Sequence, residues 1–170
     1  MTKRHTIGVI SFLLLSGVSM AGNKSNDGRS PCLEPRRYFL KLQTMTAADT
    51  GSAGVAVKLP SPVVGYVDTS IDSFYYGNAA QSDFQGPLSA VADSTRWFIM
   101  ADTNNRTLLD TITFYYERKP VFLSTACGYA MVYSLKNIVT TNYAIDSARI
   151  EKTEVTNATD VIHVKVFYKN

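Results

Sequence analysis

Hydrophobic and polar residues alternate with a period of two along much of the chain. In the segment 162–168 the even positions hold Ile, Val, Val and Tyr, and the odd positions hold His, Lys and Phe. Successive side chains of a β-strand point to opposite faces of its sheet, so this alternation predicts a half-buried strand. The even positions are expected to face the core and the odd positions to face away from it.

Similar short runs recur at spacings near ten residues, separated by Gly, Pro, Asn and Asp. Strands are expected at 37–43, 55–59, 63–67, 74–76, 88–91, 96–100, 111–116, 121–124, 129–140 and 145–155. No run of eleven or more residues carries a convincing helical stripe, and the residues of 129–139 favour a strand. The pattern therefore predicts an all-β domain, a single antiparallel β-sandwich of the immunoglobulin-like or a similar kind. A small closed β-barrel is the alternative.

The first 21 residues have the three parts of a secretory signal. Lys3 and Arg4 precede a short apolar run, and Ser19-Met20-Ala21 places small side chains where signal peptidase requires them. Gly22 occupies the position where lipid attachment needs a cysteine, so cleavage without lipidation is expected. The predicted organisation is a signal peptide over 1–21, a polar tether over 22–35 and one domain over 36–170, in a protein that is exported to the periplasm or associated with the outer membrane.

Charge and cysteine content narrow the chemistry of the exported chain. Removing 1–21 takes away Lys3 and Arg4 and no acidic residue, so the formal charge falls from +3 to +1, which gives no support to nucleic-acid binding. Cys32 and Cys127 are the two cysteines, and an oxidising compartment favours a disulfide between them. Two cysteines and one remaining histidine do not make a zinc site, so no metal and no cofactor are expected.

Candidate nucleophiles lack a base. Ser124 and Thr125 lie near Cys127, but a nucleophile needs a general base, and His163 is the one histidine after the signal. The alternation predicts that His163 lies on the solvent-facing side of the last strand. No catalytic residue is therefore predicted, and the protein is not expected to be an enzyme.

Four aromatic residues form a candidate binding surface. Tyr75, Tyr115 and Phe167 are expected on outward faces, and together with Trp97 they could build a platform for a sugar or a protein. Strand propensity and cross-strand packing explain the same residues equally well.

The order of several short elements in the C-terminal half resembles a known family. The elements are Asp110–Tyr116, Val121–Gly128 with its Ala-Cys-Gly, Ile145–Ser147, Val155–Asn157 and His163–Phe167. Together they resemble an uncharacterised envelope family of Bacteroidota, catalogued as domain of unknown function 6452, over residues 32–168. The resemblance implies a small periplasm-facing or surface β-domain without known activity that works beside outer-membrane β-barrel proteins.

The sequence thus leads to two functional hypotheses. The first is a non-enzymatic accessory or interaction domain of the cell envelope, which docks onto an envelope protein, such as an outer-membrane β-barrel, by a sheet edge or an outward aromatic face. The second is a ligand-binding module for glycans that uses the aromatic residues.

Overall fold

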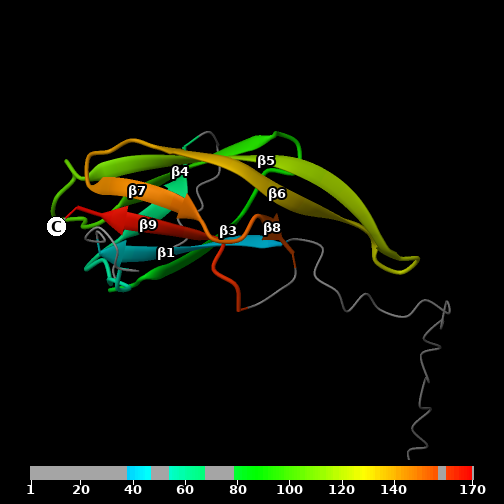
Figure 1. The fold of residues 1–170 in the computed structure, drawn as a ribbon, viewed down its shortest axis with the longest axis horizontal. Coiled ribbons are helices and arrows are strands. Elements are labelled where there is room, and N and C mark those ends of the chain that lie inside the picture. Colours follow the sequence, from blue (N-terminus) through cyan, green and yellow to red (C-terminus); the bar gives the residue numbers. More distant parts are fainter. Residues whose placement is uncertain (1–37, 47–53, 68–78, 157–159, 170) are drawn as a thin grey trace, which may run out of the picture.

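The computed structural model describes residues 38–46, 54–67, 79–156 and 160–169. These residues form strands and no helix (Figure 1). The strands are β1 (Phe39–Thr46), β2 (Val63–Tyr66), β3 (Asp83–Pro87), β4 (Ser94–Met100), β5 (Leu109–Ser124), β6 (Gly128–Thr140), β7 (Ile145–Ile150), β8 (Glu154–Val155) and β9 (Val164–Tyr168). The predicted signal peptide, the polar tether and the expected strand at 74–76 lie outside the described residues.

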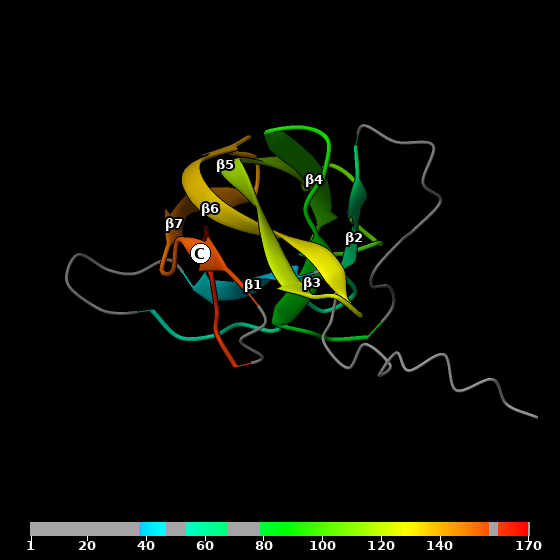
Figure 2. The same cartoon turned by 90° about the vertical axis from the view of Figure 1, so that its right-hand side faces the viewer.

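Two sheets pack face to face. One has four strands in the order β3-β1-β9-β7, and the other has five in the order β2-β4-β5-β6-β8. Figure 2 shows β4, β5 and β6 as a layer over β1 and β3. The sheets do not close into a barrel, so the prediction of an all-β sandwich is confirmed and the barrel alternative is wrong.

The core lies between the sheets and is made by alternate residues of the central strands. Leu40 and Leu42 of β1 and Val164 and Val166 of β9 are completely buried on one side. Strands β4, β5 and β6 contribute the facing side, with these buried residues: Trp97, Ile99, Ile112, Phe114, Tyr116, Tyr133 and Leu135. The period of two that predicts these strands therefore also identifies most of the core.

The four-stranded sheet is mixed and not purely antiparallel. β1 pairs with β3 antiparallel and with β9 in parallel, with Leu42 opposite Val164. The antiparallel expectation is wrong for this pair. Both strands have neighbours on each side, so their backbone groups take part in two ladders each.

β5 continues through a proline that was expected to separate two strands. The amide of Tyr116 donates to the carbonyl of Asp93, so the backbone groups of even residues in this part of β5 point toward the β4 side. Strand β4 pairs with β5 only as far as Ser94 opposite Tyr115. Pro120 therefore sits where its missing N–H faces the edge of the sheet, which is the position that tolerates proline.

Three other expected strands differ from those observed. The segment 55–59 forms two isolated bridges, Met45 with Ala56 and Leu59 with Gln81, and 88–91 is a loop. The segment 145–155 divides into β7 and β8, which belong to different sheets. β3 was not expected, because its sequence Asp-Phe-Gln-Gly-Pro has only one large apolar residue.

His163 is buried and not solvent-facing, so its predicted position is wrong. It lies one residue before β9 begins, where the alternation of strand faces does not apply. Its Nδ1 accepts a hydrogen bond of 3.0 Å from the amide of Lys41, and its own amide donates to the carbonyl of Lys41 at 3.0 Å. Burial, with a smaller effect from the Lys41 charge, lowers the pKa of His163 below its ordinary value. The imidazole is therefore a neutral structural group that joins β1 to the segment before β9.

Candidate functional site

The β5–β6 hairpin extends beyond the rest of the sandwich as a two-stranded ribbon (Figure 1). Its residues 117–124 and 128–132, here called the arm, are paired as strands only with each other among the described residues. The ladder of β4 on β5 ends at Tyr115, and β8 pairs with β6 only at Tyr133 and Ser134. Gly128, with a φ of +69°, follows the turn at the tip of the arm in a conformation that favours glycine.

One face of the arm exposes an aromatic pair near its tip. Phe122 and Tyr129 are directly opposite each other, with ring centroids 5.3 Å apart and planes at 64°. Phe122 is 54% exposed and Tyr129 is 67% exposed. Such a cross-strand pair stabilises the ribbon, but it leaves large apolar area in water on a projecting element. We call this side the aromatic face.

The opposite side of the arm is aliphatic and much less exposed. Val121 is opposite Ala130 and Lys119 is opposite Val132, so Val121, Ala130 and Val132 share a side that we call the aliphatic face. Val121 and Val132 are half-buried, and Ala130 is only 3% exposed. Near the tip, both sides of the arm therefore carry apolar side chains, whereas the exposed Lys119 lies on the aliphatic face nearer the base.

Cys127 lies in the turn at the tip of the arm. Its amide donates to Ser124 Oγ at 3.0 Å. It is only 7% exposed, and no cysteine among the described residues is a free thiol. Its predicted partner Cys32 lies outside the described residues, so the pairing stays a prediction.

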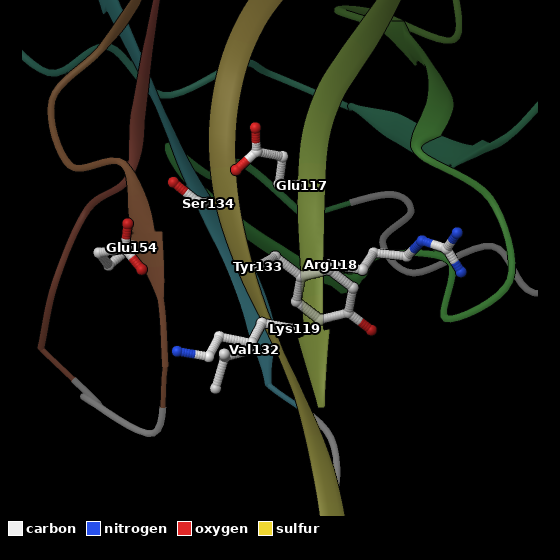
Figure 3. Close-up of a pocket in the computed structure, with 7 residues that line it drawn as sticks. All are labelled: Glu117, Arg118, Lys119, Val132, Tyr133, Ser134 and Glu154. Carbon is white, nitrogen blue, oxygen red and sulfur yellow. The ribbon is translucent and has the colours of Figure 1, made fainter. Parts of the chain in front are cut away.

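A shallow pocket of about 420 Å³ lies at the base of the arm, between β5, β6 and β8 (Figure 3). Glu117, Ser134 and Glu154 form one row across these strands, because Ser134 is opposite both glutamates. Glu117 is also 3.0 Å from the Lys136 ammonium in an exposed ion pair. Within the described part of the chain, no three His, Cys, Asp or Glu residues gather as a group that could hold a metal ion.

Trp97 does not contribute to an exposed platform, and this part of the prediction is wrong. It faces the core from β4, where its ring lies 5.0 Å from Phe114 and 6.2 Å from Tyr66, in edge-to-face contact with both. The backbone of Gly86 lies against the indole, because a Cβ built on that glycine would be 2.7 Å from Trp97 Cζ2. The indole is thus part of the packing between the two sheets.

Phe167 points away from the core, as expected, but it is buried, so it offers no open surface. Gly54 lies over the ring, since a Cβ at that position would be 3.1 Å from Phe167 Cε1. The guanidinium of Arg149 lies 5.6 Å from the ring centroid, in cation–π geometry. These two contacts cover a side chain that the alternation alone would leave in water.

Of the four predicted surface aromatics, Tyr115 is found exposed, on the outer face of β5 between Ser94 and Asn137. Tyr75 lies outside the described residues. The predicted platform is therefore not assembled from the residues that the structure describes. The sequence does not predict the exposed pair Phe122 and Tyr129. The unbroken apolar runs at 121–123 and 129–133 were a usable signal, because consecutive apolar residues in a strand place apolar side chains on both faces of the sheet.

The fold places the chain among two-sheet β-sandwich proteins, with the arm projecting from one sheet. The chain belongs to the family of unknown function DUF6452, whose model matches residues 62–168. This match begins just before β2, so residues 32–61, which the resemblance had included, are not part of it. Comparison with curated proteins and with solved structures found no match. Among the described residues, no helix has the length and apolar character to cross a membrane.

Proposed function

We propose that the protein is a non-enzymatic accessory domain of the bacterial cell envelope, which docks onto an envelope protein through the aromatic face of its arm. The observation that carries the proposal is the exposed Phe122–Tyr129 pair on an element that projects from the sandwich. Aromatic side chains near the centre of a contact contribute much of the binding energy in protein interfaces. An arm that stands clear of the domain can bring such a pair against a partner without rearrangement of the core.

The aromatic face fits docking better than the edge of the arm. The backbone groups of Arg118, Pro120 and Phe122 point to the outer edge of β5, because they share the orientation of the Tyr116 amide. Proline at this edge removes one donor that an added strand would need. The Arg118 side chain also folds back onto the loop before β4, where its Nε lies 2.6 Å from Asp93 Oδ1.

The envelope location and the partner class rest on the sequence. The pattern of residues 1–21 supports export, and the resemblance described above supports a place beside an outer-membrane β-barrel protein. On this proposal the mature chain begins at Gly22 and carries no acyl group, which intact-mass analysis of envelope fractions measures. A diacylglyceryl increment, or a retained Met1, would contradict this part of the proposal.

Site-specific photo-crosslinking tests docking. A photoreactive amino acid at Tyr129 should give a protein adduct in intact envelopes. Tyr143 is the matched control, because it is equally exposed at 67% but follows β6 at the end away from the tip. The combined Phe122→Ala and Tyr129→Ala variant should reduce capture of the same protein at least tenfold, whereas Tyr143→Ala should not.

Each result of the crosslinking decides one part of the proposal. Equal adducts from the two positions, or none from Tyr129, would overturn docking by the aromatic face. Mass spectrometry of the adduct identifies the partner, for which an outer-membrane β-barrel protein is expected. A partner of another class would refute that assignment and leave the docking surface intact.

The glycan hypothesis has weaker support. Trp97 and Phe167 are buried, and Tyr115 is the described member of the predicted platform that remains exposed. A glycan array with the wild-type chain and with Tyr115→Ala tests this alternative. Binding that depends on Tyr115 would favour it over protein docking.

A further inference from the structure

The aromatic face of the arm continues the core-facing side of β5 and β6. Tyr116, Arg118 and Phe122 alternate along this side of β5. On β6, Tyr133 is opposite Arg118 and Tyr129 is opposite Phe122. Tyr116 and Tyr133 are buried in the core, whereas Phe122 and Tyr129 are exposed. The covering of this side therefore ends between the base and the tip of the arm.

The loop between β3 and β4, residues 88–93, crosses the same side at the base of the arm. The Tyr133 hydroxyl donates to the carbonyl of Leu88 at 3.3 Å. The Ser89 amide donates to the Tyr116 hydroxyl at 2.9 Å. Because β3 and β4 belong to different sheets, the loop passes from one sheet to the other at this end of the core.

Arg118 fastens the later part of this loop to the arm. Its Nε donates to Asp93 Oδ1 at 2.6 Å, and its Nη1 donates to the carbonyl of Ala90 at 2.8 Å. Figure 3 shows the Arg118 side chain extending from β5 toward the green ribbon. The loop and the arm are thus joined through a residue of the aromatic face itself.

The loop exposes apolar side chains beside the arm. Ala90, Val91 and Ala92 are exposed, and the exposed fraction of Val91 is 88%. Ser89 Oγ accepts hydrogen bonds from the amides of Val91 and Ala92 at 3.3 and 3.1 Å, which fixes the turn. A single exposed valine is ordinary on a protein surface. Three apolar residues in a row, bonded through Arg118 to an exposed aromatic ribbon, form a larger apolar surface.

We propose that the loop 88–93 is the second half of the docking surface, and that Arg118 is the positioning residue that holds this loop beside the aromatic face. An uncharged, apolar segment of the partner protein contacts Val91 together with Phe122 and Tyr129. The inference rests on the proposed function, because it extends the contact that the arm makes with an envelope protein.

The aromatic pair alone is small for a specific contact. Large aromatic side chains bury about 150–250 Å² each, so the exposed fractions of Phe122 and Tyr129 offer about 180–300 Å². A standard protein interface covers about 800 Å² on each partner. Docking therefore needs further surface, and the loop supplies apolar area that is already fixed in place, which limits the entropy lost on binding.

The charges of this surface indicate which kind of segment fits it. Asp93 and Arg118 pair with each other. A charged partner segment would lose hydration there without gaining a counter-charge. The exposed residues of the surface carry no charge, and they are Ala90, Val91, Ala92, Pro120, Phe122 and Tyr129.

A protein segment fits this surface better than a lipid bilayer does. Arg118 and Phe122 are four residues apart, which is about 13 Å of strand. Lipid that reached from the tip to the loop would surround the open edges of the ribbon over that length. Hydrocarbon cannot satisfy the backbone groups of such edges.

A photoreactive amino acid at Val91 tests the second half of the surface. In intact envelopes it should give an adduct with the same protein that Tyr129 captures. Val55 is the matched control, because it is 72% exposed and its carbonyl accepts from the Thr46 amide. Thr46 ends β1, whereas the start of β1 pairs with Pro87 next to the loop. Val55 should therefore give no adduct with that protein.

Two variants measure the contact and the role of Arg118. Val91→Asp places a charge at a site that is already open to water, and it should weaken binding to the captured protein at least tenfold, whereas Val55→Asp should not. Arg118→Gln should also weaken binding, because it releases the loop. In the Arg118→Gln background, Val91→Asp should have much less effect than in the wild type, since the loop is no longer held in place.

Each outcome decides one part of the inference. An adduct from Tyr129 without one from Val91, or full affinity of Val91→Asp, would overturn it and leave docking by the aromatic face intact. Phospholipid adducts at Val91 would overturn the protein segment as the occupant. Additive losses in the double variant would refute the positioning role of Arg118. No adduct from Tyr129 would instead overturn the proposed function, so the two failures are distinguishable.

Discussion

Replacing Asp110 with alanine should destabilise the fold more than any other removal of a single carboxylate that we describe. Asp110 is buried and points inward from β5. Its Oδ2 accepts hydrogen bonds from the amides of Ala144 at 2.7 Å and Ile145 at 2.9 Å. Its Oδ1 accepts from the Tyr143 amide and the Thr141 hydroxyl, both at 2.8 Å. One carboxylate thus accepts most of the hydrogen bonds that the loop between β6 and β7 donates toward the core.

The structure sets the magnitude of the effect. The two donors on the Oδ2 side are buried, whereas the two on the Oδ1 side are partly exposed and can turn to water. A buried donor that loses its acceptor costs about 1–3 kcal/mol, so two of them give about 2–6 kcal/mol. The free energy of unfolding of a typical domain is about 5–15 kcal/mol, so the variant should be severely weakened.

Urea unfolding followed by tryptophan fluorescence measures this loss, because the chain has a single tryptophan and Trp97 is buried. The unfolding midpoint should fall while the slope stays constant. Asp110→Asn should be intermediate, since its amide keeps one acceptor oxygen. Asp146→Ala is the exposed control and should stay within about 0.5 kcal/mol of the wild type. A loss below about 1 kcal/mol in Asp110→Ala would refute the reasoning.

Three further predictions follow from the buried contacts. The pKa of His163 is lowered in the folded protein, so below the ordinary value of 6.5 the unfolded chain binds a proton that the folded chain does not. The free energy of unfolding should therefore fall as the pH drops below about 6.5, by at most about 1.4 kcal/mol per pH unit. His163→Gln should flatten this part of a plot of urea midpoint against pH. Gly86→Ala should lower the free energy of unfolding by about 1–3 kcal/mol and shift the Trp97 emission, because the added methyl carbon would clash with the indole. An unchanged melting temperature would show that the two sheets can move apart at this point without loss of stability. Replacing Cys32 or Cys127 by serine should each lower the free energy of unfolding by up to about 4–5 kcal/mol, and the double variant should lose little more. Non-reducing peptide mapping of the wild type should find one cross-linked peptide and not two alkylated thiols.

The sequence predicts the central strands well, because each has one apolar and one polar face. β6 and β9 are found within two residues of their expected limits, and the even positions of β9 face the core. The alternation mispredicts burial at residues that lie outside a strand. The alternation places His163 in water because it treats 162–168 as one strand, whereas the strand begins at Val164 and the preceding segment follows a different path.

The site was harder to predict than the fold, since exposure depends on which elements cover a face. Phe167 faces outward as its position requires, but Gly54 and Arg149, far away in the sequence, cover it. Phe122 has the same parity as the buried Phe114 of the same strand, yet it is exposed because β5 runs past the opposite sheet. No local pattern shows where one sheet ends relative to another.

The parallel pairing of β1 with β9 has a consequence for the order of folding. The hydrogen bond from the Lys41 amide to His163 spans 122 positions, so the first and last described strands meet in the middle of one sheet. Contacts of such long range form slowly, and the four-stranded sheet cannot close until the C-terminal strand is present. The core between the two sheets is therefore expected to form late, once the last strand of the chain has joined the first.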